Sequence, residues 1–226
     1  MMKIENRKSK IENARAFTLI ELLVVIAVIA VIAGFTIPVL NGVKRTQFRR
    51  TASGELEQIA AALDNYKAKY GFYPPGNAGT AIKSALTNQL YYELSGTTKA
   101  GANYVTLDGG SSISTANVAS RFGVGGLVNC TKGAGEDAVL AKNFLPSLKP
   151  NRSGAAGVIK LLITSVRGPD AGYMPVGVAD VNPFRYQYPG TNNPNSYDLW
   201  LQLVISGKTN LICNWSRQVQ INSSLP

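Results

Sequence analysis

The feature that most constrains this chain is an almost uninterrupted apolar run over residues 17–40. At about 1.5 Å of rise per residue, a helix of this length is roughly 36 Å long, enough to cross the hydrocarbon core of a bilayer. Glu21 is the single charged residue in the run, and Pro38 lies near its end. We therefore predict a membrane-spanning helix over residues 17–40.

Glu21 needs a partner, because a carboxylate inside hydrocarbon is strongly unfavourable unless it is paired. The nearest base, Arg15, lies on the polar flank outside the apolar run. Cleavage between Ala16 and Phe17 would create a free amine about one helical turn from Glu21. In a helical assembly, the amine of one subunit would neutralise Glu21 of its neighbour, so we predict an assembly role for this pair.

Residues 1–16 form a basic leader with five Lys or Arg residues and two Glu residues. The positive-inside tendency places this leader in the cytoplasm and everything after residue 40 outside. An ordinary secretory signal is instead cleaved after its apolar region, at a pattern of small residues. The stretch near Asn41 and Gly42 has no such pattern, so cleavage of the leader is favoured over an ordinary or uncleaved signal.

The run FTLIELLVVIAVIAVIAGFTIPVL after a short basic leader resembles the N-terminus of type IV pilins and type II secretion pseudopilins. In that family, a prepilin peptidase cuts before a Phe or Met, methylates the new amine and leaves a Glu five residues into the mature chain. The resemblance implies cleavage after Ala16, N-methylation of Phe17, assembly through Glu21 and a helix kink at Pro38. Ala16 departs from the family pattern, which usually has Gly at this position.

Residues 41–71 continue the helical pattern beyond the apolar run. Apolar residues recur there at three- and four-residue steps, which predicts one buried stripe. Gly71 is a C-cap candidate and Pro74 prevents further helix. One helix is therefore expected over residues 17–70, with its second half packed under a globular head. The stripe consists of Ala52, Leu56, Ile59, Ala60, Leu63, Tyr66 and Tyr70.

Two further segments resemble the major pseudopilin of type II secretion. Residues 63–77, LDNYKAKYGFYPPGN, are similar to its helix-to-loop corner, where tyrosines would hold the helix end against the head. Residues 178–203 are similar to its C-terminal strand pair, with strands at 182–188 and 197–200 around Pro189-Gly190. The resemblance implies an α+β fold of the type IV pilin kind, a long N-terminal helix packed on a small antiparallel sheet, with the head over residues 72–226.

Residues 78–157 carry the weakest pattern and are interpreted as a loop-rich variable excursion on the surface. Within them, apolar spacing predicts a helix over residues 81–94, and residues 136–145 suggest a short helix or turn. Gly-Val-Gly-Gly at 123–126 lacks the Lys and Ser/Thr of a phosphate loop, so phosphate binding is not expected. Residues 158–226 are interpreted as a C-terminal β-region, and the largely apolar residues 158–163 predict its first strand.

Major pseudopilins commonly follow the C-terminal hairpin with an acidic loop that binds calcium, a cation that requires several oxygen ligands. In this chain residues 206–215 contain no acid, Asp198 alone cannot supply a site and Lys208 would repel a cation. No calcium and no other cofactor or metal is expected. Cys130 and Cys213 are the only cysteines, and they either form a disulfide in an oxidising compartment or remain free.

The net charge of +10 falls to +7 when the leader is removed. These charges are scattered apart from a cluster near the apolar run, interpreted as solvated charge or lipid-headgroup contact, so nucleic acid is not an expected partner. A type IV pilin or minor pilin that binds DNA or a surface remains the main alternative. A membrane-anchored enzyme is a remote one, because the chain has no His and no catalytic motif. The basic cluster consists of Lys44, Arg45, Arg49 and Arg50.

The expected function is that of a non-enzymatic structural subunit of a type II secretion pseudopilus or related type IV pilus-like filament. Its expected partners are other copies of itself, the prepilin peptidase, the inner-membrane secretion or pilus assembly machinery and minor pseudopilins. The expected location is the bacterial inner membrane, in a single pass with the N-terminus cytoplasmic and the head periplasmic. Assembly would then move the chain into a filament in the periplasm or at the cell surface.

Overall fold

A computed structural model describes most of the chain, which divides into two compact units, Met1–Lys44 and Arg45–Pro226. For residues 35–41 only the backbone is described. The predicted leader, including Ala16, lies outside the described residues. Those residues are 17–76, 85–133, 135–167, 170 and 172–222.

One helix, α1, runs from Leu19 to Tyr70 and contributes to both units. This confirms the single helix predicted over residues 17–70, with a start two residues later. The helix is continuous through Pro38, but the side chains of residues 35–41 are not described, so the kink at Pro38 stays a prediction. In the part of the chain that is described, no helix is both long and apolar enough to cross a membrane.

In the first unit, α1 exposes large apolar side chains on every side. Residues 22–26 are five consecutive exposed apolar positions, and at about 100° per residue they cover the whole circumference of the helix. A helix that is apolar all round is normally buried. In the isolated chain this surface therefore has no cover. The exposed side chains are Leu19, Ile20, Leu22, Leu23, Val24, Val25, Ile26, Val28, Ile29, Val31 and Ile32.

In the head, the predicted apolar stripe of α1 faces the protein interior. Ile59, Leu63 and Tyr66 have no exposed surface. The helix ends at Tyr70, and Gly71 follows with a left-handed φ of 82°. The N–H of Gly71 donates to the carbonyl four residues earlier at 2.7 Å. The predicted glycine C-cap is confirmed, because glycine adopts this conformation without a steric penalty.

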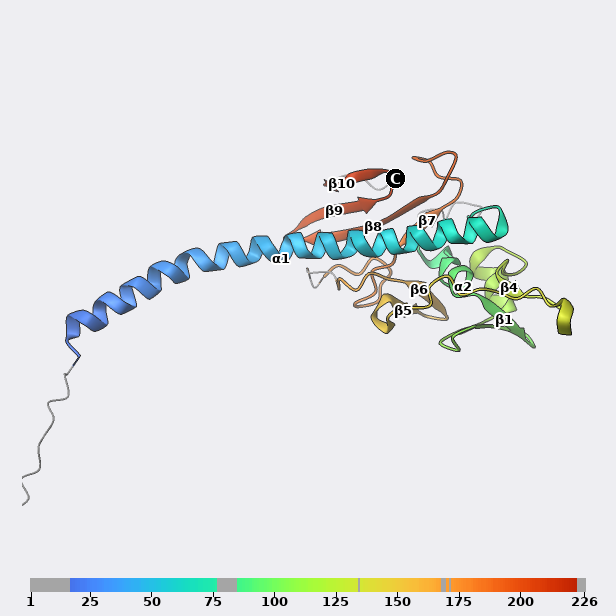
Figure 1. Cartoon of the computed structure of the whole chain (residues 1–226), viewed down its shortest axis with the longest axis horizontal. Helices are drawn as coiled ribbons and strands as arrows, with labels where there is room; N and C mark the ends of the chain where they lie inside the picture. Colours follow the sequence, from blue (N-terminus) through green and yellow to red (C-terminus); the bar gives the residue numbers. More distant parts are fainter. Residues whose placement is uncertain (1–16, 77–84, 134, 168–169, 171, 223–226) are drawn as a thin grey trace, which may run out of the picture. The chain divides into compact units, whose positions relative to one another are not determined.

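The C-terminal region forms a four-stranded antiparallel sheet that lies along α1 (Figure 1). Leu199, Leu201 and Leu203 alternate along one strand, are fully buried and belong to the same core as the helix stripe. The strand pair predicted at residues 182–188 and 197–200 is present, but its first strand is shorter than expected, with three residues, and its second strand is longer. In the spatial order β10-β9-β8-β7, the strands are β7 Arg185–Gln187, β8 Asp198–Ile205, β9 Lys208–Cys213 and β10 Ser216–Ile221.

Shorter elements complete the head. A second sheet has the order β3-β2-β1-β4, with β1 and β4 parallel and the other pairs antiparallel. The hairpin β5–β6 confirms the strand predicted at the start of the C-terminal region. The strands are β1 Thr97–Ala100, β2 Asn103–Thr106, β3 Ser112–Ser114, β4 Cys130–Thr131, β5 Ser153–Ala156 and β6 Ile159–Leu162. The short helices are η1 Ala85–Thr87, α2 Leu90–Ser95, α3 Thr115–Asn117, η2 Val118–Phe122, η3 Gly135–Asp137 and η4 Pro150–Arg152.

The structure corrects the interpretation of residues 78–157 as a surface excursion. Leu90 and Tyr92 on α2 are at most 1% exposed and belong to the core that contains α1. The helix predicted over residues 81–94 is replaced, in its described part, by η1 and the shorter α2. The reason is local, because the side chain of Asn88 accepts a hydrogen bond from the N–H of Leu90 at 2.7 Å. Such a bond offers the backbone an alternative to a continuous helix.

The packing of β8 against the core generates a stability prediction. Leu199→Ala should lower the free energy of unfolding by about 2–5 kcal/mol, because it removes buried methyl groups and leaves a cavity. Val158→Ala is the control, since Val158 is 53% exposed, and it should change stability by less than about 0.5 kcal/mol. Urea unfolding of the full chain in detergent, followed by tryptophan fluorescence, measures both. Equal effects would contradict the assigned core.

Candidate assembly site

The start of α1 holds a reciprocal hydrogen-bonded pair between Thr18 and Glu21. The hydroxyl and the backbone N–H of Thr18 each donate to Oε2 of Glu21 at 2.8 Å, and the N–H of Glu21 donates to Oγ1 of Thr18 at 3.3 Å. This capping box satisfies N–H groups that have no partner within the helix. The sequence analysis missed Thr18, although the Thr-x-x-Glu spacing before an apolar run indicates a capping box.

Glu21 keeps one carboxylate oxygen available. Both bonds from Thr18 end on Oε2, and Oε1 has no hydrogen-bond partner among the described residues. The side chain is exposed in the isolated chain. Phe17, the predicted new N-terminus, lies two residues before the first residue of α1 and is 73% exposed. Oε1 is therefore free to accept a hydrogen bond from a donor on another molecule without breaking the cap.

Aromatic side chains hold the other end of α1 in the head, which confirms the predicted tyrosine contacts. The ring centroids of Tyr66 and Tyr70 lie 4.6 Å apart, and Phe144 lies 5.4 Å from the first ring and 6.2 Å from the second. Tyr73 packs edge-on against Tyr197 of the C-terminal region at 4.8 Å. The end of the helix is thus fixed by two groups of rings that come from different parts of the chain.

A buried carboxylate lies beside this aromatic cluster. Glu93 on α2 has no exposed surface and accepts hydrogen bonds from the N–H of Val128 at 2.8 Å and the N–H of Asn129 at 2.9 Å. The hydroxyl of Tyr66 donates to it at 3.1 Å. Burial raises the pKa of Glu93, while its hydrogen bonds act in the opposite direction. Because its lone pairs are satisfied, the carboxylate can stay buried and fixes α2 to the helix end.

Asn129 extends the same network. Its Nδ2 donates to the backbone oxygens of Glu93 at 2.7 Å and Lys142 at 2.6 Å. Its Oδ1 accepts from the hydroxyl of Tyr70 at 2.7 Å and from the N–H of Lys142 at 2.9 Å. One amide side chain therefore joins the end of α1 to α2 and to the segment that precedes Phe144.

A second buried carboxylate, Glu55, lies on α1 and is not one of the apolar residues from which the buried stripe was predicted. Glu55 is 7% exposed and accepts from the Thr164 hydroxyl at 2.6 Å and the Ser165 N–H at 3.0 Å. Its Oε1 pairs with Nε of Arg152 at 3.5 Å. Arg152 also donates to the side chain of Gln58 and to the backbone oxygen of Glu55. These bonds attach β5 and β6 to the middle of α1.

Asp198 is the residue on which calcium binding would depend, and its carboxylate is fully engaged. Oδ2 accepts from the backbone and side-chain N–H groups of Asn192 at 2.8 and 3.0 Å, and Oδ1 from those of Asn193 at 3.0 and 3.1 Å. An added Cβ at Gly190 would lie 2.6 Å from Oδ1. Among the described residues, no cluster of three or more His, Cys, Asp or Glu side chains could hold a metal. A surrounding of N–H donors does not fit Ca²⁺, which requires oxygen ligands.

The two cysteines are free thiols. Cys130 lies on β4 and Cys213 on β9, so they belong to different sheets, and both are buried. The disulfide that the sequence left as one of two alternatives is therefore not formed in the structure. Burial raises the pKa of the Cys213 thiol. A raised pKa lowers the fraction of thiolate and hence the reactivity of the sulfur.

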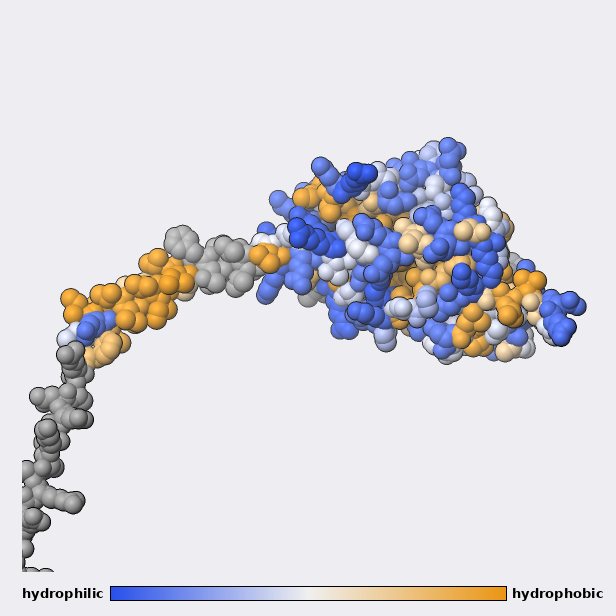
Figure 2. Space-filling model, viewed as in Figure 1, coloured by the Kyte–Doolittle hydropathy of each residue, from blue (hydrophilic) through white to orange (hydrophobic). Residues whose placement is uncertain are grey.

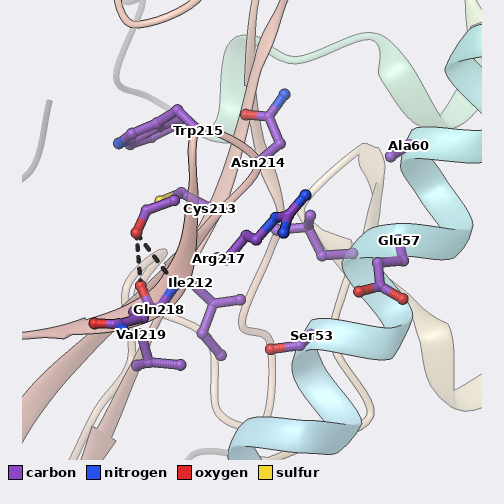
Figure 3. A pocket seen from close by; sticks show the side chains of 12 residues that line it. Ser53, Glu57, Ala60, Ile212, Cys213, Asn214, Trp215, Arg217, Gln218 and Val219 are labelled. Carbon is purple, nitrogen blue, oxygen red and sulfur yellow. Dashed lines mark hydrogen bonds between the residues drawn. The ribbon is translucent and has the colours of Figure 1, made fainter.

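A pocket of about 400 Å³ lies between α1 and the strands β9 and β10 (Figure 3). Figure 3 shows Ser53 and Glu57 projecting from α1, with Cys213 and Arg217 on the strand side. The chain contains no histidine. Cys213 is buried, and the chain has no imidazole that could activate its thiol as a nucleophile.

The start of α1 matches a family model described as "Prokaryotic N-terminal methylation motif" over residues 12–37. Type II secretion system core protein G of Escherichia coli (strain K12) is 37% identical over 68 residues, which are 30% of this chain and 47% of the relative. The core protein G of Pectobacterium carotovorum is 37% identical over 73 residues, 32% of this chain and 46% of the relative. The chain is thus similar to these core proteins over about a third of its length.

The similarity of this chain to core protein G is partial. The core protein G of Klebsiella pneumoniae is likewise similar over only part of its length, with 35% identity over 68 residues, which are 30% of this chain and 49% of the relative. The chain thus spans about half the length of the curated relatives it matches. No solved structure matches the chain.

The Glu55–Arg152 pair generates a stability prediction for the head. Glu55→Ala should lower the free energy of unfolding by about 3–5 kcal/mol, because it leaves the buried Arg152 without its charge partner. Glu57→Ala is the matched control, two positions along the same helix and exposed, with an expected change below about 0.5 kcal/mol. Urea unfolding of the full chain in detergent measures both. A small effect of Glu55→Ala would show that the pair does not hold β5 and β6 to α1.

The environment of Glu93 generates a pH prediction. Because burial raises the pKa of Glu93 in the folded state, the folded chain binds more protons than the unfolded chain at pH values above the ordinary pKa of a glutamate. The stability that Glu93 contributes is therefore present at low pH and is lost as the pH rises through its folded-state pKa. Stability should fall more steeply with rising pH in the wild type than in Glu93→Gln. Parallel slopes in urea unfolding at a series of pH values would contradict this.

Proposed function

We propose that this chain is a structural, non-enzymatic subunit of a type II secretion pseudopilus or a related type IV pilus-like filament. The observation that carries the proposal is the methylation motif on a helix start whose acid, Glu21, caps its own chain and keeps Oε1 free. The relatives similar to the chain are named as core proteins of type II secretion systems. We infer cleavage between Ala16 and Phe17 by a prepilin peptidase, followed by methylation of the Phe17 amine.

The proposed domain organisation follows from this processing. Residues 1–16 are a leader that is removed, and residues 17–40 form the membrane and filament-core helix. Residues 41–71 are the half of the helix that packs on the head, and residues 72–226 form the head itself. Before assembly the chain spans the bacterial inner membrane once, with its N-terminus in the cytoplasm and its head in the periplasm, as the excess of basic residues in the leader supports.

Assembly is driven in this proposal by the exposed apolar side chains of the first unit. As the filament grows, the helices of other copies replace lipid in contact with these side chains. The apolar surface is therefore covered both in the membrane and in the filament. The Phe17 amine of one copy lies against Oε1 of Glu21 in a neighbour and fixes the register of the two helices. The assembly machinery of the inner membrane and minor pseudopilins are the further proposed partners.

The proposed registering pair can be tested separately from the helix cap. Glu21→Gln keeps a side chain that a capping box accepts but removes the charge, so it should leave the protein in the membrane and abolish filaments. Thr18→Ala keeps the charge and removes the cap, a loss of about 0.5–2 kcal/mol of helix stability, and should retain filaments. Electron microscopy of the producing cells and membrane fractionation give the readouts. Normal filaments from Glu21→Gln would overturn the proposal.

Processing is tested by the intact mass of the chain purified from its host's membranes. A chain that begins at N-methylated Phe17 is the expected product. A chain that still carries residues 1–16 would indicate a simple membrane anchor and would remove the filament argument. Ala16→Gly is the control for the peptidase site, because it restores the residue usual in the family and should leave the mass of the mature chain unchanged.

A further inference from the structure

A cleft runs along α1 in the head and has two chemically different halves. One half, with a volume of about 530 Å³, lies between the α1 segment around Arg50 and the residues 147–152. The other half, about 200 Å³, is lined by residues 144–148. Gln58, Ser147 and Arg152 line both halves, so the two hollows adjoin.

The first half of the cleft is basic. The side chains of Arg50 and Lys149 line it, are exposed and form no ion pair or hydrogen bond with any residue that the structure describes. Glu55 also lines it, but its carboxylate is buried and paired with Arg152. The two free cations therefore set the sign of the potential in this half, and an acidic ligand would meet them without displacing an existing partner.

The second half of the cleft is apolar. It is walled by Phe144, Leu145, Pro146 and Leu148. Phe144 is held from behind by the rings of Tyr66 and Tyr70, so this wall is fixed by the core of the head. A ligand that fits the whole cleft must combine acidic groups with apolar side chains.

One surface loop of this chain, residues 135–140, has that combination. Glu136 and Asp137 on η3 are exposed and form no ion pair with any described residue, and Val139 and Leu140 are 60% and 66% exposed. Backbone hydrogen bonds between Lys132 and the loop, at 3.0 and 2.9 Å, hold its base. At the end of the head where this short helix projects, Figure 2 shows a hydrophilic tip beside hydrophobic atoms.

The loop cannot reach the basic half of its own cleft in this conformation. The Lys69 ammonium donates to the carbonyl of Leu140 at 2.8 Å, which places the loop at the C-terminal end of α1. Arg50 lies 19 residues earlier on the same helix, a distance of roughly 28 Å along its axis. In Figure 1 the short helix after β4 projects at one end of the head, while β5, which follows the cleft residues, lies well away from it. The loop 135–140 of one head can therefore meet the basic half of a cleft only on a second copy of the chain.

We propose that this cleft binds the loop 135–140 of a second copy of the chain. Glu136 and Asp137 of one copy lie against Arg50 and Lys149 of the next, and the two exposed aliphatic side chains cover the apolar half. This contact joins two different surfaces, and such a head-to-tail contact continues from copy to copy into an open helical polymer. The inference deepens the proposed filament function and rests on it for its setting, but it concerns contacts between heads rather than between N-terminal helices.

The contact is tested by cross-linking the full chain. Unlabelled and ¹⁵N-labelled chains are mixed in detergent, returned to lipid vesicles and treated with a carbodiimide, which joins amines to carboxylates in direct contact. Mass spectrometry should find Lys149 joined to Asp137 or Glu136 in peptides that contain one labelled and one unlabelled partner. Links within single chains only, or no link at all, would overturn the proposal.

A charge exchange tests the same contact by function. Arg50→Glu, which leaves the reacting amine of Lys149 in place, should lower the yield of mixed cross-links about tenfold, the change that roughly 1.4 kcal/mol of lost pairing produces. Combining it with Asp137→Lys should restore the yield, with the link now joining the exchanged side chains. Lys208→Glu is the control, because Lys208 is an exposed lysine at the start of β9 that does not line the cleft. A defect that the combined exchange does not rescue would overturn the contact and would point to another anionic ligand.

Failure of this contact and failure of the filament proposal give different results. If Glu21→Gln abolishes filaments while Arg50→Glu leaves filaments and cross-links unchanged, the filament function stands and the cleft proposal falls. If the wild type forms no filaments but gives mixed cross-links that respond to the charge exchange, the cleft contact stands and the filament function falls.

Discussion

The structure of this chain depends on covering the apolar surface of α1. In the head, the stripe that contains Ile59 and Leu63 is covered by the core that β8 and α2 complete. In the first unit the same helix exposes apolar side chains on all sides, and the single chain supplies no cover for them. Buried apolar surface contributes about 25 cal/mol per Å², so association with lipid or with other copies is strongly favoured. One half of α1 is thus covered by the core of its own head, and the other half needs cover from lipid or from other copies, as the proposed move from membrane to filament requires.

The parts of the fold that follow from local patterns were predictable from the sequence. α1 and its end were predicted from the apolar run, from the three- and four-residue spacing up to Tyr70 and from the glycine at position 71. Each of these patterns is a property of residues that are close together in the sequence. The strand pair β7–β8 was predicted from alternation and from the resemblance around Pro189. The capping box at Thr18 was missed, although its spacing signal lies in the sequence.

The parts that were not predictable depend on contacts between distant residues. Glu93 meets Asn129 across 36 positions, and Glu55 meets Thr164 across 109. A buried carboxylate has no local signature, since the same residue on a solvated helix face looks identical in the sequence. For this reason residues 78–157 were interpreted as a surface excursion, whereas the partners of Glu93 bring α2 into the core. The two cysteines remain free thiols because they lie in different sheets, and the spacing of cysteines in the sequence does not predict which sheet contains each of them.

Four carboxylates of this chain differ in how many of their oxygens accept hydrogen bonds from other groups of the same chain. Glu55, Glu93 and Asp198 are buried, and hydrogen-bond donors from their own chain occupy both oxygens of each. Glu21 is exposed, and among the residues that the structure describes, hydrogen bonds reach only its Oε2. A carboxylate moved into an apolar assembly with one oxygen unpaired would lose hydration without compensation. The apolar surface around Glu21 is therefore compatible with burial only when a donor from another molecule reaches Oε1, which is the contact that the proposed registering pair would supply.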